Sequence, residues 1–212
     1  DWGLPAARIH LIRNAVPETV VPEAALPPAE AIAGRAPNRF AYLGNLAGHK
    51  GLPQLLKAAA LLRAEGSGIR ITLHGDMVHP AEPDRARMEG LIAEAWPVVQ
   101  HLGRYAREDV PALLAATDWV VLPAVWPENA PLAVLEALQV GKPVICAPVG
   151  GLPELVQHGV NGLHVPRGDV HALAATLGEA AADPVAWQRL AEAPAIARAS
   201  PTISKRTGRC SR

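Results

Sequence analysis

The clearest indication of the fold is the stretch WVVLPAVWPENAPLAVLEALQVGKPVICA, residues 119–147. It opens on an apolar run and passes through a proline-rich loop. A helix-length apolar segment follows, with proline at its start and glycine after its end, and a second apolar run closes the stretch. Short apolar runs on either side of a helix are typical of parallel strands buried on both faces. We therefore predict strands at 119–122 and 143–147 with a helix at 131–140 between them.

The same alternation continues on both sides of this unit. Further strands are predicted at 39–43, 69–73, 98–102 and 162–165, and further helices at 52–65, 83–95, 110–116, 152–157, 170–182 and 185–193. Strands that alternate with helices and are apolar on both faces indicate an α/β fold, here a Rossmann-like doubly wound parallel sheet with helices on both faces. Ligands of such sheets bind beyond the carboxyl ends of the strands. We therefore expect the functional residues in the loops at 44–51, 75–82, 103–108, 123–130 and 147–151.

Length and composition indicate one folded domain with extensions. The chain has 212 residues, with 20 Lys and Arg against 20 Asp and Glu, so its net charge gives no sign of a nucleic-acid or anionic-membrane partner. Two cysteines argue against a disulfide scaffold and a structural zinc site, and suit a reducing compartment. No apolar run is long enough to span a bilayer, and the first residues do not resemble a signal peptide. We expect a cytoplasmic protein.

The two ends of the chain differ in composition from its middle. Residues 1–37 read as an inter-domain segment and Pro/Ala-rich linker, with a short strand at 9–12, and residues 38–195 as the folded domain. Residues 196–212 form a basic tail, which is either a solvated terminus or a segment that docks on something outside this chain. The chain begins without Met, which suits processing or a piece of a longer protein.

Several common site motifs are missing. No G-x-G-x-x-G follows a strand, and no G-x-x-x-x-G-K-[ST] occurs, which argues against a nicotinamide enzyme and a P-loop NTPase. The eight histidines form no H-E-x-x-H pair, and G-x-S-x-G is absent. Neither a metal site nor a hydrolase nucleophile is supported.

The loop after the first strand of the domain is suited to an anion. Gly44, Gly48 and Gly51 let backbone N–H groups come close to a ligand. Lys50 lies immediately before the helix predicted from residue 52, where the helix dipole also favours negative charge. The alternative is an ordinary glycine-rich turn with a solvated lysine.

The loop and helix at 123–138 carry the second set of candidates. Asn129 is a natural N-cap and Pro131 a natural first-turn residue, so free N–H groups near 130–132 would suit phosphate. Glu136 lies in an apolar helix and needs partners, for which ribose hydroxyls would serve. Glu128, just before the helix, could accept hydrogen bonds from sugar hydroxyls. The alternative is that Glu136 pairs with an arginine and Glu128 is solvated.

These residues carry a resemblance to a known family. Glu128 and Glu136, followed by Ala-Leu-x-x-Gly-Lys-Pro-Val-Ile, resemble the E-x7-E signature of retaining glycosyltransferases of the GT-B fold, and in particular glycosyltransferase family 4 (glycosyl transferases group 1). Four further blocks resemble the family in the same order: 12–17, which is similar to the inter-domain hinge, 42–51, 102–123 with Asp118, and 149–163. The resemblance covers about residues 10–195.

The resemblance implies that residues 38–195 are the domain that binds a nucleotide-sugar donor. Lys50 would hold the diphosphate and neutralise the leaving group, Glu128 would hold the transferred sugar, and Glu136 the ribose; Lys50 and Glu128 are the implied catalytic residues. Arg104 and Tyr105 would meet the base, mostly by backbone atoms. The other implied donor contacts are Gly44, Asn45, Asn129, Ala130 and Leu132. Asn45 stands where many members have arginine, so one positive charge is missing.

The resemblance further implies a UDP- or GDP-sugar donor, a hexosyl transfer, no metal or other cofactor, and an N-terminal acceptor domain of the same protein. The isolated domain would then be inactive, and the full-length protein could associate with the membrane surface. Two alternatives stay open. One is a GT-B-fold sugar-nucleotide epimerase or phosphorylase, although no block suggests a pyridoxal-phosphate lysine. The other is a non-catalytic nucleotide-binding or interaction module, for which Asn45 is the argument.

Overall fold

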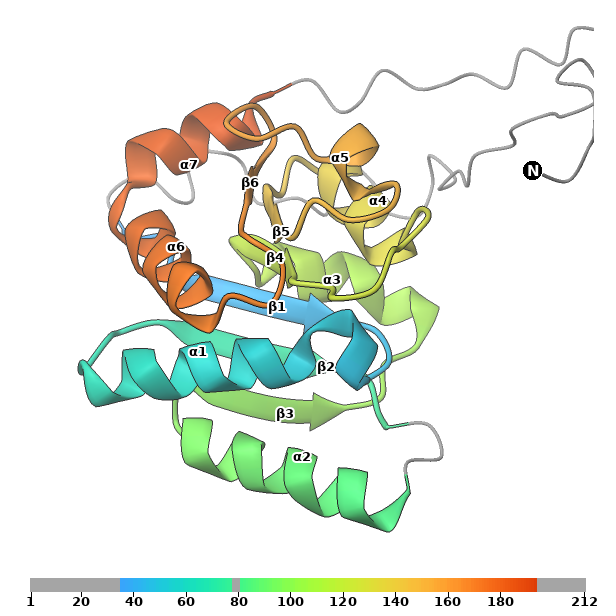
Figure 1. Ribbon diagram of the computed structural model, residues 1–212. Coiled ribbons are helices and arrows are strands. Elements are labelled where there is room, and N and C mark those ends of the chain that lie inside the picture. Colours follow the sequence, from blue (N-terminus) through green and yellow to red (C-terminus); the bar gives the residue numbers. More distant parts are fainter. Residues whose placement is uncertain (1–34, 78–80, 194–212) are drawn as a thin grey trace, which may run out of the picture.

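The computed structural model describes residues 35–77 and 81–193 and contains one six-stranded parallel sheet. The strand order is β3-β2-β1-β4-β5-β6. The arrows of β1 and β3 point to the right in Figure 1, so the carboxyl ends of these strands lie on that side. The strands are β1 (Arg39–Leu43), β2 (Arg70–His74), β3 (Val99–Gly103), β4 (Trp119–Leu122), β5 (Val144–Cys146) and β6 (Gly162–His164).

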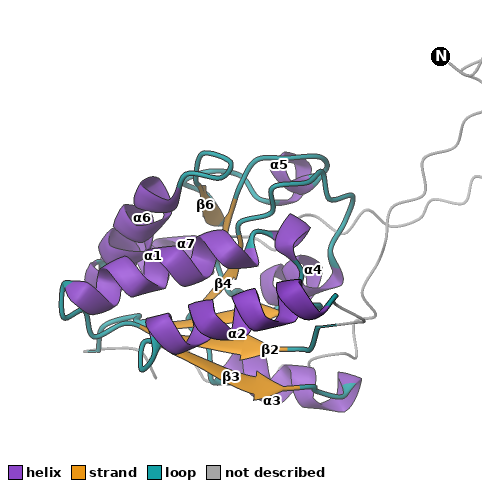
Figure 2. Cartoon of the chain, turned by 60° about the horizontal axis from the view of Figure 1, so that its bottom comes forward, coloured by secondary structure: helices purple, strands orange, loops and turns teal. Residues whose placement is uncertain are grey.

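Helices cover both faces of the sheet, which confirms the predicted doubly wound α/β fold. Helix α1 packs between α2 and α6 on one face, whereas α3 and α4 lie behind the sheet in Figures 1 and 2. The helices are α1 (Leu52–Ala64), α2 (Glu82–Ala95), α3 (Val110–Ala115), α4 (Leu132–Gln139), α5 (Leu152–Leu155), α6 (Val170–Ala182) and α7 (Pro184–Ala191), with single 3₁₀ turns at η4 (Gly48–Lys50) and η5 (Arg107–Asp109).

The core forms between these layers because the apolar positions recur with the period of each element. Leu55, Leu56, Ala59 and Leu62 line the buried face of α1, as the helical spacing predicts. Every residue of β4 is buried, because this strand lies in the middle of the sheet. Burial of one such leucine side chain contributes about 1.5–3 kcal/mol.

The observed elements differ from the predicted ones mainly at their ends. Strand β3 is not apolar on both faces: Gln100, His101 and Leu102 are exposed, because β3 is an edge strand with one neighbour. The helix predicted at 152–157 ends at Leu155, because the Asn161 side chain donates to the Leu155 carbonyl (3.0 Å) and accepts from the Gln157 N–H (2.7 Å). The strand predicted at 9–12 and the basic tail lie outside the described residues.

A charge cluster anchors the sheet at the end opposite the carboxyl ends of the strands. Asp118, which directly precedes β4, is fully buried and accepts hydrogen bonds from Arg35 (Nη1 to Oδ2, 2.9 Å) and Arg39 (Nη2 to Oδ1, 3.0 Å). Its carbonyl also accepts from Trp187 Nε1 in α7 (2.9 Å). Lys142 is buried beside this cluster, and its burial lowers the pKa of the ammonium to about 8. The cluster therefore joins the ends of the described segment to the middle of the sheet.

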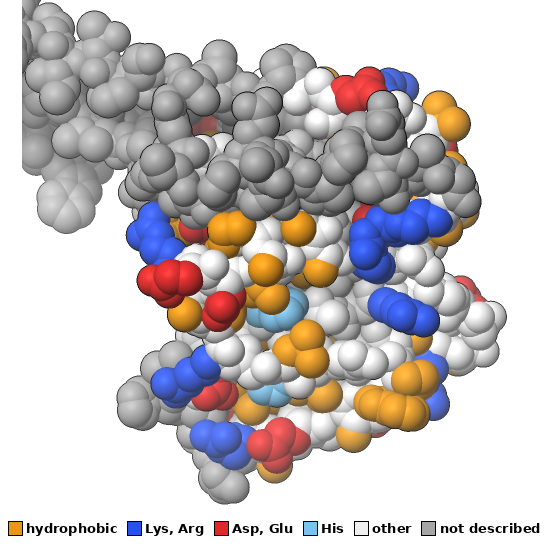
Figure 3. All heavy atoms as spheres, turned by 180° about the vertical axis from the view of Figure 1, so that it is seen from behind, with side chains coloured by type: hydrophobic (Ala, Val, Ile, Leu, Met, Phe, Trp, Pro, Cys, Tyr) orange, Lys and Arg blue, Asp and Glu red, His pale blue; other side chains and the backbone are white. Residues whose placement is uncertain are grey.

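The surface carries no broad cationic area on the face that Figure 3 shows, as far as the structure describes it. Lys and Arg side chains stand there in small separate groups, several of them beside acidic side chains. With 20 basic and 20 acidic side chains in the whole chain, any strong attraction for an anion must come from a local arrangement of charges.

Candidate functional site

The order of the strands places a topological switch point between β1 and β4. These strands are neighbours in the sheet, with Phe40 opposite Trp119 and Ala41 opposite Val120, although they are not consecutive in the chain. Chains leaving the carboxyl ends of such a pair diverge, and ligands bind where they do so. The two loops that leave here, 44–51 and 123–131, are those with the strongest candidate residues.

The two loops are in direct contact. The carbonyl of His49 accepts hydrogen bonds from the backbone N–H groups of Val125 (3.0 Å) and Trp126 (3.1 Å). Gly51 has φ +78°, and a Cβ built there would lie 1.8 Å from the Pro123 carbonyl oxygen. Only glycine fits that position, because any side chain would push the two loops apart.

This contact brings Lys50 and Glu128 together. Lys50 Nζ lies 3.1 Å from Glu128 Oε1, and the two side chains are 24% and 17% exposed. The alternative expectation, that both side chains are solvated and have no ionic partner, is therefore not what the structure shows. A cation and an anion that are partly shielded from water form the centre of the candidate site.

The loop after β5 packs against Glu128. The Gly151 N–H donates to the Glu128 carbonyl (2.6 Å), and Gly150 forms a parallel bridge with Glu128. A Cβ at Gly150 would lie 2.3 Å from the Glu128 carbonyl oxygen, and one at Gly151 would lie 2.0 Å from the Asn129 carbonyl oxygen. The Gly150–Gly151 pair is therefore the feature that allows the loop after β5 to pack against the Glu128 loop.

Helix α4 begins at Leu132, later than the sequence predicts. Its N-cap is Pro131, in extended conformation (φ −61°, ψ 127°) and without a side-chain cap. The prediction of Asn129 as the N-cap is wrong, because the backbone stays extended through Pro131. The N–H groups of Val134 and Leu135 donate to the Pro131 carbonyl. Leu132 and the residue after it therefore present their N–H groups at the positive end of the helix dipole.

Glu136 lies in α4 and is 7% exposed. Burial raises the pKa of its carboxyl group, and the positive charge of Arg107 acts in the opposite direction. Among the described residues no ion pair contains Glu136. The alternative expectation was that Glu136 pairs with an arginine; Arg107 affects the pKa of Glu136 but forms no ion pair with it. Burial also raises the pKa of Tyr105, and the charge of Glu136 adds to that shift.

Tyr42 is a buried polar residue to which sequence reasoning assigned no role. It is fully buried, and its hydroxyl donates to the Asn45 carbonyl (2.7 Å). Its pKa is raised by burial and further by the charges of Glu128 and Tyr105. Tyr42 therefore fixes the loop after β1 at Asn45. The available signal was a tyrosine inside an apolar strand, since a buried Tyr hydroxyl needs a hydrogen-bond partner.

The side chain of Arg104 forms an ion pair with Asp76. Arg104 Nε lies 2.9 Å from Asp76 Oδ2, and this hydrogen bond, followed by one from the Met77 N–H, lowers the pKa of Asp76. The pair links the loop after β3 to the loop after β2. Asp76 was not among the candidates. The expected contact of Arg104 and Tyr105 with a base stays a prediction.

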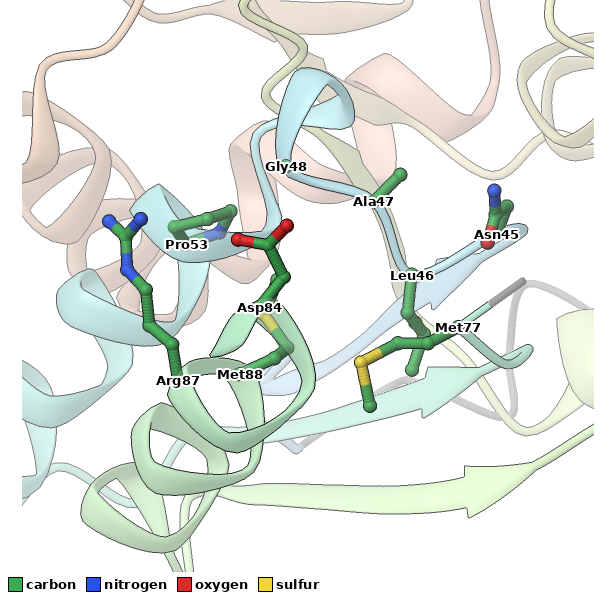
Figure 4. Close-up of a pocket in the computed structure, with 9 residues that line it drawn as sticks. All are labelled: Asn45, Leu46, Ala47, Gly48, Pro53, Met77, Asp84, Arg87 and Met88. Carbon is green, nitrogen blue, oxygen red and sulfur yellow. The ribbon is translucent and has the colours of Figure 1, made fainter. Parts of the chain in front are cut away.

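A pocket of about 250 Å³ lies on the α2 side of the loop after β1. Figure 4 shows Asp84 and Arg87 of α2 on one side of it and Leu46 and Ala47 on the other. Asn45 and Gly48 of the candidate loop border it, and neither Lys50 nor Glu128 lines it. The pocket therefore adjoins the loop that carries Lys50 and does not include the Lys50–Glu128 pair.

Two features are absent from the residues that the structure describes. No group of three or more His, Cys, Asp or Glu side chains there is placed to hold a metal ion. None of the helices in the described ranges has the length and apolar character to span a membrane.

Solved structures share this architecture. The Anabaena protein Alr3699/HepE, in complex with UDP and glucose, superimposes with a TM-score of 0.74 at 26% identity, over 90% of this chain and 52% of that one. The C-terminal domain of the glycosyl transferase group 1 family protein LpcC from Francisella tularensis shares the fold with a TM-score of 0.64 at 20% identity, over 72% of this chain and 80% of that domain.

Curated relatives have similar sequences over part of their length. The amylovoran biosynthesis glycosyltransferase AmsK of Erwinia amylovora is 31% identical over 159 residues, 70% of this chain and 38% of that protein. A glycogen synthase of Mycobacterium tuberculosis is 31% identical over 193 residues, 91% of this chain and 44% of that protein. The chain therefore spans less than half the length of these relatives. The sequence model described as "Glycosyl transferases group 1" matches residues 30–195. This chain belongs to the glycosyl transferases group 1 family.

Proposed function

We propose that this chain binds the donor, a UDP- or GDP-linked hexose, of a retaining, metal-independent glycosyltransferase of family 4. The observation that supports this most is the placement of Lys50 against Glu128 (3.1 Å) at the switch between β1 and β4, where α4 also begins. A cation, a carboxylate and the positive end of a helix dipole then lie on the loops that leave one switch point of the sheet. A nucleotide sugar offers a diphosphate and hydroxyl groups for these partners.

The diphosphate would lie between the loop after β1 and the start of α4. Lys50 would pair with it and stabilise the charge that develops on the leaving group. The N–H of Leu132 would donate to it at the helix N-terminus. The loop after β1, at Gly44 and Asn45, and the loop before α4, at Ala130, would supply backbone contacts. Asn45 brings no charge, so Lys50 carries the cationic role in this proposal.

The nucleoside and the hexose would lie on opposite sides of the diphosphate. Glu136 would accept hydrogen bonds from the ribose hydroxyls, and the Arg104–Tyr105 backbone would meet the base. Glu128 would accept from hydroxyls of the transferred sugar, with Asn129 next to it. The E-x7-E spacing, which resembles that of retaining enzymes, is the reason for proposing retention.

Transfer would require a second domain. The chain spans 38% and 44% of the two relatives described above. A GT-B enzyme places its active site between two domains, so an N-terminal acceptor domain is proposed as the partner. This chain alone would bind donor and transfer no sugar.

Calorimetric titration of the folded chain with UDP, GDP and ADP tests the proposal. We expect saturable one-to-one binding of UDP or GDP. Failure of all three nucleotides to bind a folded sample would contradict the proposal.

The role of Glu136 gives a separate prediction. We expect Glu136→Gln to weaken UDP binding about tenfold, because hydrogen bonds to a charged group contribute about 1.5–3 kcal/mol. The loss should be small for 2′-deoxy-UDP, which has one ribose hydroxyl fewer. Burial raises the pKa of Glu136, so affinity in the unmodified chain should fall as the pH decreases toward that pKa and the carboxylate becomes protonated. The variant should lack this component of the pH dependence. Equal losses for both nucleotides would place Glu136 away from the ribose.

A further inference from the structure

The Lys50–Glu128 ion pair is held in place from both sides. The His49 carbonyl, one residue before Lys50, binds the backbone of Val125 and Trp126, in the loop that carries Glu128. The carbonyl of Glu128 is fixed in turn by the Gly151 N–H (2.6 Å). The two side chains can therefore separate by rotation within the site, while the loops that carry them stay bound to each other.

In the site without ligand, each charge of this pair compensates the other. Lys50 is the cationic partner of Glu128 among the ion pairs of the described residues. The nearby phenol of Tyr42 stays neutral at physiological pH, because burial and the charge of Glu128 raise its pKa. A diphosphate that attracts Lys50 therefore leaves Glu128 without its cation. What happens next depends on whether the ligand offers Glu128 a new donor.

We propose that Glu128 discriminates between a nucleotide sugar and a free nucleoside diphosphate, and thereby promotes release of the product. This inference rests on the proposed function. With a nucleotide sugar, hydroxyl groups of the hexose take the place of the Lys50 ammonium and donate to the carboxylate. With a free nucleoside diphosphate, no hydroxyl is present, and the carboxylate faces a phosphate.

The charges of the two ligands strengthen this difference. A terminal phosphate carries roughly −1.5 to −2 charges at pH 7, whereas the ester to the sugar removes one of its ionisable oxygens. The free diphosphate therefore brings more negative charge beside an unpaired carboxylate. Once the sugar has left, Glu128 competes with the product diphosphate for Lys50. The ion pair that forms again in the empty site favours dissociation of the product.

Calorimetry on Glu128→Gln tests the inference with UDP and UDP-glucose, or with GDP and GDP-mannose if the chain selects guanine. We expect free diphosphate to bind about fivefold more tightly than to the unmodified chain, because loss of a partly exposed ion pair and of one like charge is a change of this order. The nucleotide sugar should bind no more tightly than before, so its preference over the diphosphate falls. Glu179→Gln, with the same change of charge on an exposed position of α6, should leave both affinities unchanged.

A second measurement needs no variant. Free glucose, or mannose with GDP, should increase the affinity of the unmodified chain for the diphosphate, because it supplies hydroxyl donors to Glu128; this coupling is reciprocal. Tighter diphosphate binding by Glu128→Gln supports the inference, and equal or weaker diphosphate binding by the folded variant overturns it. Where the variant does not fold, a positive coupling with the sugar supports the inference, and no coupling overturns it. If the unmodified chain binds no nucleotide, the proposed function fails, and this inference fails with it.

Discussion

Replacing Asp118 with alanine should lower the free energy of unfolding by about 3 kcal/mol, because loss of one partner of a buried ion pair leaves the other charge uncompensated. Asp118 is fully buried, and it binds both Arg35 and Arg39. Their side chains are 33% and 40% exposed, so water recovers part of the loss. Lys142, buried beside the cluster, also loses its nearby negative charge. Urea unfolding followed by circular dichroism measures the effect.

The matched control is Glu179→Ala, at an exposed position near the end of α6, which should change stability by less than about 0.5 kcal/mol. The pH dependence gives a second check. Burial alone would raise the pKa of Asp118, but hydrogen bonds from Arg35 and Arg39 outweigh it and lower the pKa below its usual value. The stabilisation is therefore complete above the unfolded-state pKa, about 3.9, and is lost as the pH falls through the lower folded-state pKa. Equal stability of the two variants would show that the cluster does not hold the fold together.

Replacing Lys50 with methionine should weaken binding of UDP or GDP about 10- to 100-fold, which corresponds to loss of a charge-assisted hydrogen bond worth about 1.5–3 kcal/mol. The fold should survive, because Lys50 and its partner Glu128 are both partly exposed. Methionine keeps an unbranched side chain that is one atom shorter, and it removes the charge. Calorimetric titration of both proteins measures the difference.

Lys57→Met controls for the loss of one positive charge from the chain. Lys57 is exposed on α1, and its replacement should leave the affinity within about twofold, because charges on the exposed surface are screened by salt. If the two variants bind nucleotide equally well, the diphosphate does not lie at Lys50. The proposed position of the donor would then be wrong.

The sequence predicted most elements because their signals are local. Arg39–Leu43, Trp119–Leu122 and Val170–Ala182 occur where the apolar runs and the helical period indicate. The errors lie at the ends of elements, where one particular side chain or backbone conformation sets the boundary. Asn161 ends α5 early through its side chain, and α4 begins at Leu132 because Pro131 is extended. Neither effect follows from the periodicity of the segment itself.

The sequence predicted which residues belong to the candidate site but not how these residues contact one another. Lys50, Glu128 and Glu136 were identified from their positions after strands or within an apolar helix. The sequence could not show that Lys50 pairs with Glu128, that the Tyr42 hydroxyl binds the Asn45 carbonyl, or that Arg104 binds Asp76. The two ion pairs join segments that are far apart in the chain.

The order of strands and helices, and the glycines and prolines at their ends, can be read from the sequence alone, as can the E-x7-E spacing, because they involve residues close together along the chain. Which loops lie next to each other depends on the tertiary structure. The pairing of β1 with β4 joins segments that are far apart in the chain. It places the Lys50 loop against the Glu128 loop, with Gly51 allowing their close approach. A charged side chain acquires its partner, and therefore its chemistry, only when the fold brings the two charges together.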